Sequence, residues 1–201
     1  IKFKKKNLKD VDIKKIKVLN FIPNINLSKI KKKIYFENYL KINENFIFVP
    51  NQFWAHKNHE CIINALSLLN KKGIKIKCIL TGKNFDHRNP YLFRSLMKKI
   101  KQFKLDKQIL YRGIVPYNDV ISLIYHSTLI INPSFFEGWS TTVEEAKLLN
   151  KKIILSDITT HLEQNPDNAV FFDPKKPNEL AKKIEKNFFK KLKNKKNLNF
   201  L

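Results

Sequence analysis

Residues 128–157, TLIINPSFFEGWSTTVEEAKLLNKKIILSD, contain a strand, a turn, a helix and a second strand in that order. TLIINPS (128–134) and KKIILSD (151–157) are apolar runs bounded by polar and turn-forming residues, which is typical of buried strands. Between them, TTVEEAKLL (141–149) can form a short helix. A strand, a helix and a second strand form a βαβ unit, in which the two strands lie parallel in one sheet.

The same alternation extends over most of the chain. The predicted strands are 46–50, 76–82, 109–113, 128–134, 151–157 and 169–173, and the predicted helices are about 58–72, 90–105, 117–126, 141–149 and from about 176. Gly73 is expected to end the helix that precedes it. Because the strands are nearly continuous apolar runs, both faces of the sheet should be covered. The predicted fold class is therefore α/β, a Rossmann-like parallel sheet with helices on both faces.

The two ends of the chain differ from this pattern. We predict a lead-in segment over 1–45, a Rossmann-like domain over 46–186 and a lysine-rich helix or tail over 187–201. Within the lead-in, residues 17–28 are expected to form a strand that turns at Pro23–Asn24, followed by a short helix over 30–42. The chain begins at Ile1 and not at Met, so the natural protein is expected to start further upstream.

The formal net charge of +23 comes almost entirely from lysine, since the only arginines are Arg88, Arg94 and Arg112. A surface that reads bases would use arginine forks and exposed aromatic rings, so we do not expect nucleic acid as a partner. A lysine coat in solvent is favoured, and attraction to an anionic membrane surface or an acidic glycan is the alternative that stays open.

Neither a run of eighteen apolar residues nor the apolar core of a signal peptide is present. Cys61 and Cys78 lie in apolar contexts and are expected to be buried, reduced thiols. The expected location is the cytoplasm, with the inner face of the membrane as an option.

Three of the four glycines, Gly82, Gly113 and Gly138, lie at or shortly after the ends of predicted strands. The carboxyl edge of an open parallel sheet is where ligands bind, and glycine lets a ligand approach the backbone closely. Ordinary turn chemistry would explain any one of these glycines. Their occurrence on one edge favours a binding site.

The turn before residues 141–149 carries the clearest candidate site. Free N–H groups at the start of a helix suit phosphate, and Ser140, Thr141 and Thr142 add hydroxyls. A capping box, Thr141 with Glu144 or Thr142 with Glu145, would account for one of the two helical acids. It would not account for Glu137, which precedes the helix.

The loop NQFWAHKNH (51–59) is a second candidate, because it also joins a strand to a helix. Lys57 could pair with a diphosphate, and an ordinary surface lysine is the alternative. His56 and His59 have no second group of ligands at a convincing spacing, so no metal site is predicted.

Together these segments resemble the C-terminal, donor-binding domain of family-4 retaining glycosyltransferases, which have the GT-B fold. The resemblance covers roughly residues 46–186, and its most specific element is the E-x7-E motif filled by Glu137 and Glu145. It implies that Glu137 lies by the transferred sugar as the catalytic residue, and that Glu145 binds the ribose. Glu144 is left as the capping acid.

The resemblance also implies roles for other donor-binding residues. Lys57 would bind the diphosphate, and the backbone near Val115 would contact the base. The sugar and the β-phosphate would be bound by the backbone amides of Gly138, Trp139, Ser140 and Thr141. Gly82 would lie on the same edge of the sheet. The chain departs from the family at Gln52, where arginine is common, and at Ser140–Thr142, which replace glycine-leucine-proline. His56, His59 and Arg88 are candidates to support the diphosphate in compensation.

The implied function is metal-independent transfer of a hexosyl group from a nucleotide sugar to a glycan or lipid-linked acceptor, with retention, in surface polysaccharide or glycolipid synthesis. No cofactor is implied. The N-terminal acceptor domain of such enzymes has no counterpart here. The alternatives are another GT-B enzyme, such as a sugar-nucleotide epimerase, or a basic binding module for anionic membrane or nucleic acid.

Overall fold

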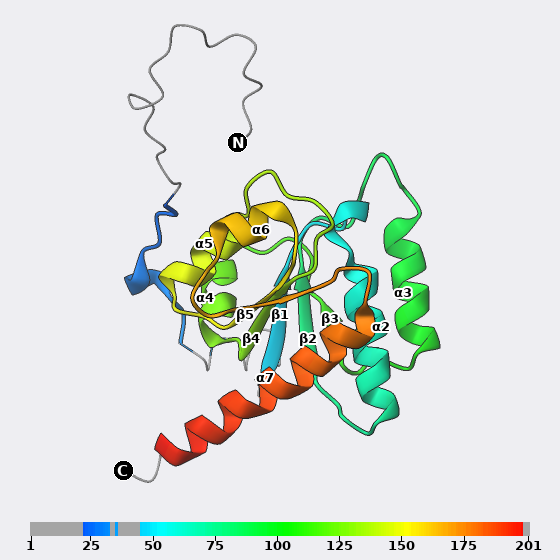
Figure 1. The fold of residues 1–201 in the computed structure, drawn as a ribbon. Coiled ribbons are helices and arrows are strands. Elements are labelled where there is room, and N and C mark those ends of the chain that lie inside the picture. Colours follow the sequence, from blue (N-terminus) through cyan, green and yellow to red (C-terminus); the bar gives the residue numbers. More distant parts are fainter. Residues whose placement is uncertain (1–21, 33–34, 36–44, 199–201) are drawn as a thin grey trace, which may run out of the picture.

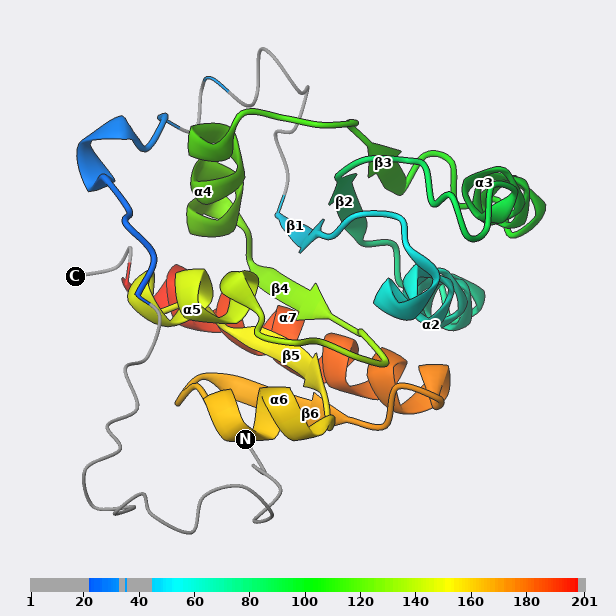
Figure 2. The ribbon, with the colours of Figure 1, turned by 90° about the horizontal axis from the view of Figure 1, so that it is seen from above.

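The computed structural model describes residues 22–32, 35 and 45–198. Six parallel strands form one sheet in the order β3-β2-β1-β4-β5-β6 (Figures 1 and 2). Their bounds are β1 Phe46–Pro50, β2 Lys77–Thr81, β3 Ile109–Tyr111, β4 Leu129–Asn132, β5 Ile153–Ser156 and β6 Ala169–Phe172. Each differs from the predicted range by no more than two residues at either end. The prediction of a parallel Rossmann-like sheet is confirmed.

Helices cover both faces of the sheet. They are α2 His59–Lys71, α3 Leu92–Gln102, α4 Tyr117–His126, α5 Thr141–Leu148, α6 Thr159–Gln164 and α7 Pro177–Leu198. Figure 2 shows α2, α3 and α7 on one side and α4 and α5 on the other. Gly73 follows the end of α2 with a φ of +77°, as the C-terminal cap prediction requires.

The core follows the alternation of side chains along the strands. In β1, Ile47 and Val49 pack with α2, α3 and α7, whereas Phe46 and Phe48 pack with α4 and α5. All four side chains are buried. Cys61 and Cys78 are buried and free, as expected.

The N-terminal segment does not form the predicted strand in its described part. Leu27–Lys29 form a 3-10 helix that Asn26 caps by accepting a hydrogen bond from Ser28 N. Ile25 and Ile30 pack onto the α4 side of the core, and Lys31 N donates to Ser122 Oγ on α4. This segment therefore covers a helix instead of pairing with the sheet. Residues 17–21 and most of the helix predicted over 30–42 lie outside the described residues.

The end of the chain forms one helix, since α7 crosses residue 186 without a break. The division of the chain at 45/46 and 186/187 stays a prediction. No helix within the described ranges is both long and apolar enough to cross a bilayer.

Candidate functional site

The central strands β1 and β4 lie side by side, but the chain leaves them toward opposite halves of the sheet. Such a switch point opens a crevice beyond the carboxyl ends of the strands. The loops after β1 and β4 are tied together there. Phe135 N donates to His56 O at 2.7 Å, and Asn58 Nδ2 donates to Pro133 O at 3.0 Å. Residues that are about 75 positions apart in the chain therefore form one rim.

Lys57 and Glu137 form an ion pair across this crevice. Lys57 Nζ lies 2.8 Å from each carboxylate oxygen of Glu137, and the two side chains are 13% and 7% exposed. The two charges that the sequence placed on separate loops thus meet at one point.

Asn132, the last residue of β4, hydrogen-bonds to the carboxylate of this pair. Its Nδ2 group donates to Glu137 Oε1 at 3.3 Å, and Ser134 Oγ lies 2.7 Å from the same oxygen. Asn51 Nδ2, at the end of β1, donates to Asn132 Oδ1. Burial alone would raise the pKa of Glu137, but the bonds from Lys57, Ser134 and Asn132 outweigh it and lower that pKa. Glu137 is therefore held ionised at neutral pH.

Glu145 has the opposite electrostatic setting. It is 5% exposed on α5, and its burial raises the pKa although the Tyr117 hydroxyl donates to it. Burial and the nearby carboxylate also raise the pKa of Tyr117 to about 12. Tyr117 is the first residue of α4, so Glu145 faces the loop that contains Val115.

The predicted capping box is wrong. Helix α5 has Ser140 as its N-cap, without a hydrogen bond from the capping side chain to the helix, and Val143 stands at the third helical position. Glu144 instead accepts a hydrogen bond from Gln164 Nε2 at 2.8 Å and pairs with Lys147 at 3.3 Å. Neither helical acid caps the helix, because Gln164 from α6 has taken over the backbone of the N-cap residue.

The start of α5 presents free hydrogen-bond donors. The backbone N–H groups of Gly138, Trp139, Thr141 and Thr142 have no acceptor in the part of the chain that the structure describes. Ser140 differs, because its N–H donates to Gln164 Oε1 and its hydroxyl accepts from Asn132. Ser140 and Thr142 are buried, and only Thr141 of the three hydroxyl residues is exposed. Free N–H groups and the positive end of the helix dipole suit an anion.

The glycines of the predicted edge have different reasons to be glycine. Gly82 has a φ of +122°, and a Cβ there would lie 2.5 Å from Asn51 O. Gly113 has a φ of +69°. Gly138 lies in open space and has an ordinary φ. Gly82 thus fixes how the loops after β1 and β2 meet.

The residues predicted to support the diphosphate are only partly brought together. Gln52 accepts a hydrogen bond from Lys83 N, and Arg88 pairs with Asp86, which in turn accepts from Ala55 N near Lys57. The ring of His56 lies 6.5 Å from that of Phe136 on the rim, and its pKa is lowered by burial and by Lys57.

His59 is buried at the start of α2. It stacks on Phe53 with ring centroids 4.1 Å apart, and burial lowers its pKa to about 3. Within the described residues, no three His, Cys, Asp or Glu side chains gather as they would around a metal ion.

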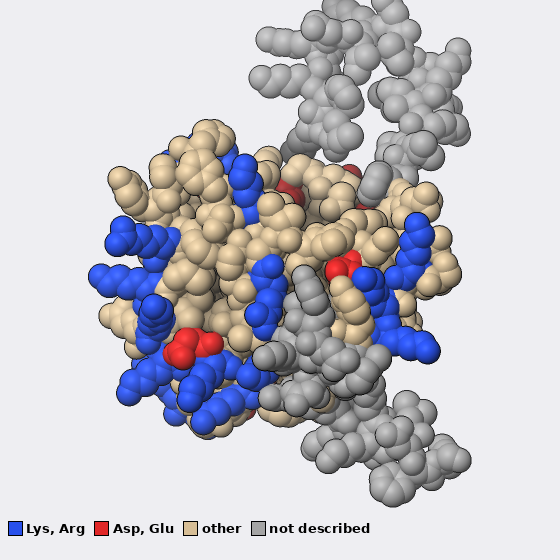
Figure 3. All heavy atoms as spheres, turned by 180° about the vertical axis from the view of Figure 1, so that it is seen from behind, with Lys and Arg blue, Asp and Glu red and all other residues tan. Residues whose placement is uncertain are grey.

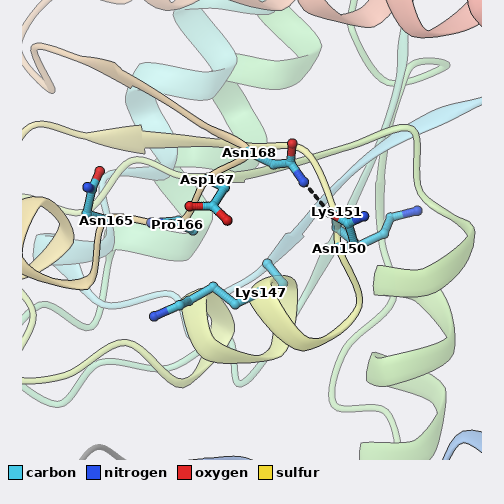
Figure 4. A pocket seen from close by; sticks show the side chains of 8 residues that line it. Lys147, Asn150, Lys151, Asn165, Pro166, Asp167 and Asn168 are labelled. Atoms are coloured by element: carbon cyan, nitrogen blue, oxygen red, sulfur yellow. Dashed lines mark hydrogen bonds between the residues drawn. The ribbon is translucent and has the colours of Figure 1, made fainter.

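A small cavity of about 100 Å³ lies at the opposite edge of the sheet, where the chain enters β5 and β6 (Figure 4). None of the predicted site residues lines it.

Sequence reasoning missed several polar residues that contact the site from neighbouring elements. Asn51, Asn132 and Ser134, at the ends of the two central strands, and Gln164 on α6 are buried, whereas Thr160 on α6 is half-buried and Tyr117 on α4 is exposed. A polar residue that directly ends an apolar strand, as in VPN and IIN, was the available signal.

The fold is similar to one half of solved GT-B glycosyltransferases. A glycosyltransferase from Rickettsia africae is 26% identical, with a TM-score of 0.68 over 82% of this chain and 42% of that chain. The HepE protein of Anabaena in complex with UDP is 19% identical, with a TM-score of 0.68 over 81% and 43%. A trehalose-phosphate synthase from Burkholderia xenovorans is 13% identical, with a TM-score of 0.67 over 80% and 40%. The chain thus spans about two fifths of each of these proteins.

A family model described as Glycosyl transferases group 1 matches residues 30–199. The chain belongs to this family. No curated protein matches it in sequence.

Proposed function

We propose that this chain is the donor-binding half of a retaining glycosyltransferase. It would move a hexosyl group from a nucleotide sugar to a glycan or lipid-linked acceptor in surface polysaccharide or glycolipid synthesis. The observation that carries the proposal is the meeting of Lys57 and Glu137 across the switch point, beside the free N–H groups at the start of α5. One cation, one anion and a set of amide donors lie together there.

The diphosphate would bind to Lys57 and to the N–H groups of Gly138, Trp139 and Thr141. An ammonium group and a helix N-terminus can neutralise the leaving nucleotide diphosphate in place of a divalent cation. A diphosphate and Glu137 would then compete for Lys57. Thr141 is the exposed hydroxyl where the chain departs from its family, so it is the side chain that we expect to influence the choice of donor.

The sugar would lie against Glu137 and the ribose against Glu145. An ionised carboxylate can accept hydrogen bonds from sugar hydroxyls. As the bond from the anomeric carbon to the phosphate breaks, positive charge develops on the ring, and the ionised Glu137 would stabilise it. The half-buried Val115, in the loop facing Glu145, would meet the base through its backbone.

Binding of nucleotides tests this proposal directly. We expect titration calorimetry to detect one or more of UDP, GDP, ADP and dTDP, with the same affinity in the presence of EDTA. The Lys57→Met variant should bind markedly less tightly. If a folded chain binds none of the four nucleotides, the proposal is wrong. An epimerase would bind a nucleotide too, and analysis of products from a nucleotide sugar with an acceptor separates it.

The acceptor half would come from a second domain, since the neighbouring structures are more than twice as long as the matched region. Anionic membrane is the partner suggested by charge, which would place the protein on the cytoplasmic face. Lysines precede or begin several strands at the edge away from the crevice, namely Lys75, Lys77, Lys104, Lys107, Lys151 and Lys152. Figure 3 shows basic side chains on both sides and in the middle of the back face. Sedimentation with phosphatidylserine vesicles, but not with phosphatidylcholine vesicles, would support this location.

A further inference from the structure

We infer that Gln164 is a positioning residue that holds the turn from Glu137 to Ser140 in the shape required for nucleotide binding. Gln164 is the last residue of α6 and is 4% exposed, although glutamine is usually a surface residue. This inference rests on the proposed function, because it concerns the same site.

The side-chain amide of Gln164 makes three hydrogen bonds to the start of α5. Its Oε1 atom accepts from Ser140 N at 3.3 Å, and its Nε2 group donates to Ser140 O at 2.9 Å and to Glu144 Oε1 at 2.8 Å. Ser140 is thus held by both its N–H and its C=O, as it would be by a neighbouring strand. No other side chain of this length offers an acceptor and two donors from one planar group.

Helix α6 also holds the other end of the turn. Thr160 Oγ1 donates to Glu137 O at 2.8 Å. Glu137 and Ser140 therefore have backbone groups fixed by one short helix, and the two residues between them, Gly138 and Trp139, carry free N–H groups. The position of those donors follows from the position of α6.

Helix α6 is itself anchored to the sheet and to α5. His161 Nδ1 lies 3.1 Å from Ser156 Oγ, which donates to Ser134 O at 2.5 Å. Lys147 Nζ, on α5, donates to Gln164 O at 3.1 Å. Figure 4 shows the Lys147 side chain reaching from α5 toward the segment that contains Asn165. The turn from Glu137 to Ser140 is therefore held by a helix, α6, that is itself fixed to the sheet and to α5.

The contact with Gln164 also determines which backbone donors are available to a ligand. Gln164 accepts the hydrogen bond of the Ser140 N–H group, so the free N–H groups are those of Gly138, Trp139, Thr141 and Thr142. Gln164 also donates a hydrogen bond to the buried carboxylate of Glu144, whose charge is paired with Lys147.

The Gln164→Met variant keeps the length of the side chain and removes all three bonds. We expect its affinity for UDP, or for whichever nucleotide the wild type binds, to fall by at least about tenfold, the loss of one charge-assisted hydrogen bond. Glu163→Gln, an exposed site on the same helix, is the matched control and should bind normally. Equal affinity of Gln164→Met and wild type would overturn the inference.

A swap of amide and carboxylate provides a rescue test. Gln164→Glu places a carboxylate against Glu144 and removes both donors, so nucleotide affinity should fall. Adding Glu144→Gln restores one donor to the pair and should recover part of the affinity. No recovery in the double variant would contradict a role through this contact.

Hydrogen exchange of the wild type and variants separates this inference from the proposed function. We expect Gln164→Met to speed exchange in residues 137–143 only. A rise that includes β1 and β2 would indicate general loss of stability and would overturn a positioning role. If the wild type binds no nucleotide, the proposed function fails, and exchange confined to the turn still shows whether Gln164 orders it.

Discussion

Lys57 Nζ lies 2.8 Å from both carboxylate oxygens of Glu137, and this contact joins the loops after the two central strands. Both side chains are largely withdrawn from solvent, with 13% and 7% exposure. In such a place each charge depends on the other, because an unpaired buried charge is much more costly than a solvated one. The pair therefore contributes to the stability of the site as well as to its proposed chemistry.

Removing either partner should destabilise the protein. We expect Lys57→Met and Glu137→Gln each to lower the free energy of unfolding by about 3 kcal/mol, because each leaves the other group without its partner. The double variant should lose clearly less than the sum. Urea unfolding of the four proteins measures this cycle, and strictly additive losses would mean that the pair does not act as a unit.

The two acids of the motif should respond oppositely to pH. The pKa of Glu137 is lowered on folding, so its contribution to stability is present above the unfolded pKa and is lost as pH falls through the folded value. The pKa of Glu145 is raised by burial, so its contribution is present in acid and is lost as pH rises through the folded value.

At pH 7, Glu137→Gln should therefore destabilise the protein, and Glu145→Gln should stabilise it. The Glu145→Gln difference should shrink as the pH falls from 7 toward about 4, because the folded pKa lies above the unfolded one. The Glu137→Gln difference should shrink only as the pH falls below about 4, because the folded pKa lies below the unfolded one. Urea midpoints between pH 3.5 and 7 provide the measurement. Changes of the same sign at pH 7 would contradict the opposite settings of the two groups.

The sequence was sufficient for the sheet because each strand is an apolar run between turn residues. IKCIL and KKIIL could hardly be anything else in a chain of this pattern. Helix α6 was missed because six residues, TTHLEQ, are too few to show a helical period. Of the segment predicted over 17–28, only residues 22–28 are described, and they cover α4 without pairing with the sheet, because apolar residues such as Ile25 are equally suited to covering a helix.

The charged residues of the site could be predicted from the sequence, but the contacts between residues that are far apart in the chain could not. Glu137, Glu145 and Lys57 could be singled out from their places after strands, and the structure brings Lys57 and Glu137 together. The capping box failed because local spacing cannot reveal that Gln164, 24 residues from Ser140, already binds the N-cap backbone. The roles of Glu137, Glu145 and Lys57 in binding a donor stay predictions.

Variants of the adjacent acids Glu144 and Glu145 on α5 should distinguish a residue that binds the nucleotide from one that supports the turn. We expect Glu145→Ala to weaken nucleotide binding by about tenfold, the loss of a charged hydrogen-bond acceptor for the ribose. Glu144→Ala leaves two of the three bonds of Gln164 in place, so its effect on affinity should be smaller. Calorimetry with the preferred nucleotide makes the comparison. A larger effect of Glu144→Ala would show that Glu145 is not the acid that binds the ribose.

Two glycines of the same edge provide the last contrast. A Cβ at Gly82 would lie 2.5 Å from Asn51 O, and its φ of +122° disfavours any other residue. Gly82→Ala should therefore lower the free energy of unfolding by at least about 2 kcal/mol. A Cβ at Gly138 meets nothing within 4 Å, so Gly138→Ala should change stability by no more than about 0.5 kcal/mol. Its methyl group would instead stand beside the free N–H groups and reduce nucleotide affinity. Urea unfolding and calorimetry on the same two variants test both claims, and a Gly138→Ala protein with unchanged affinity would show that the ligand does not approach this turn.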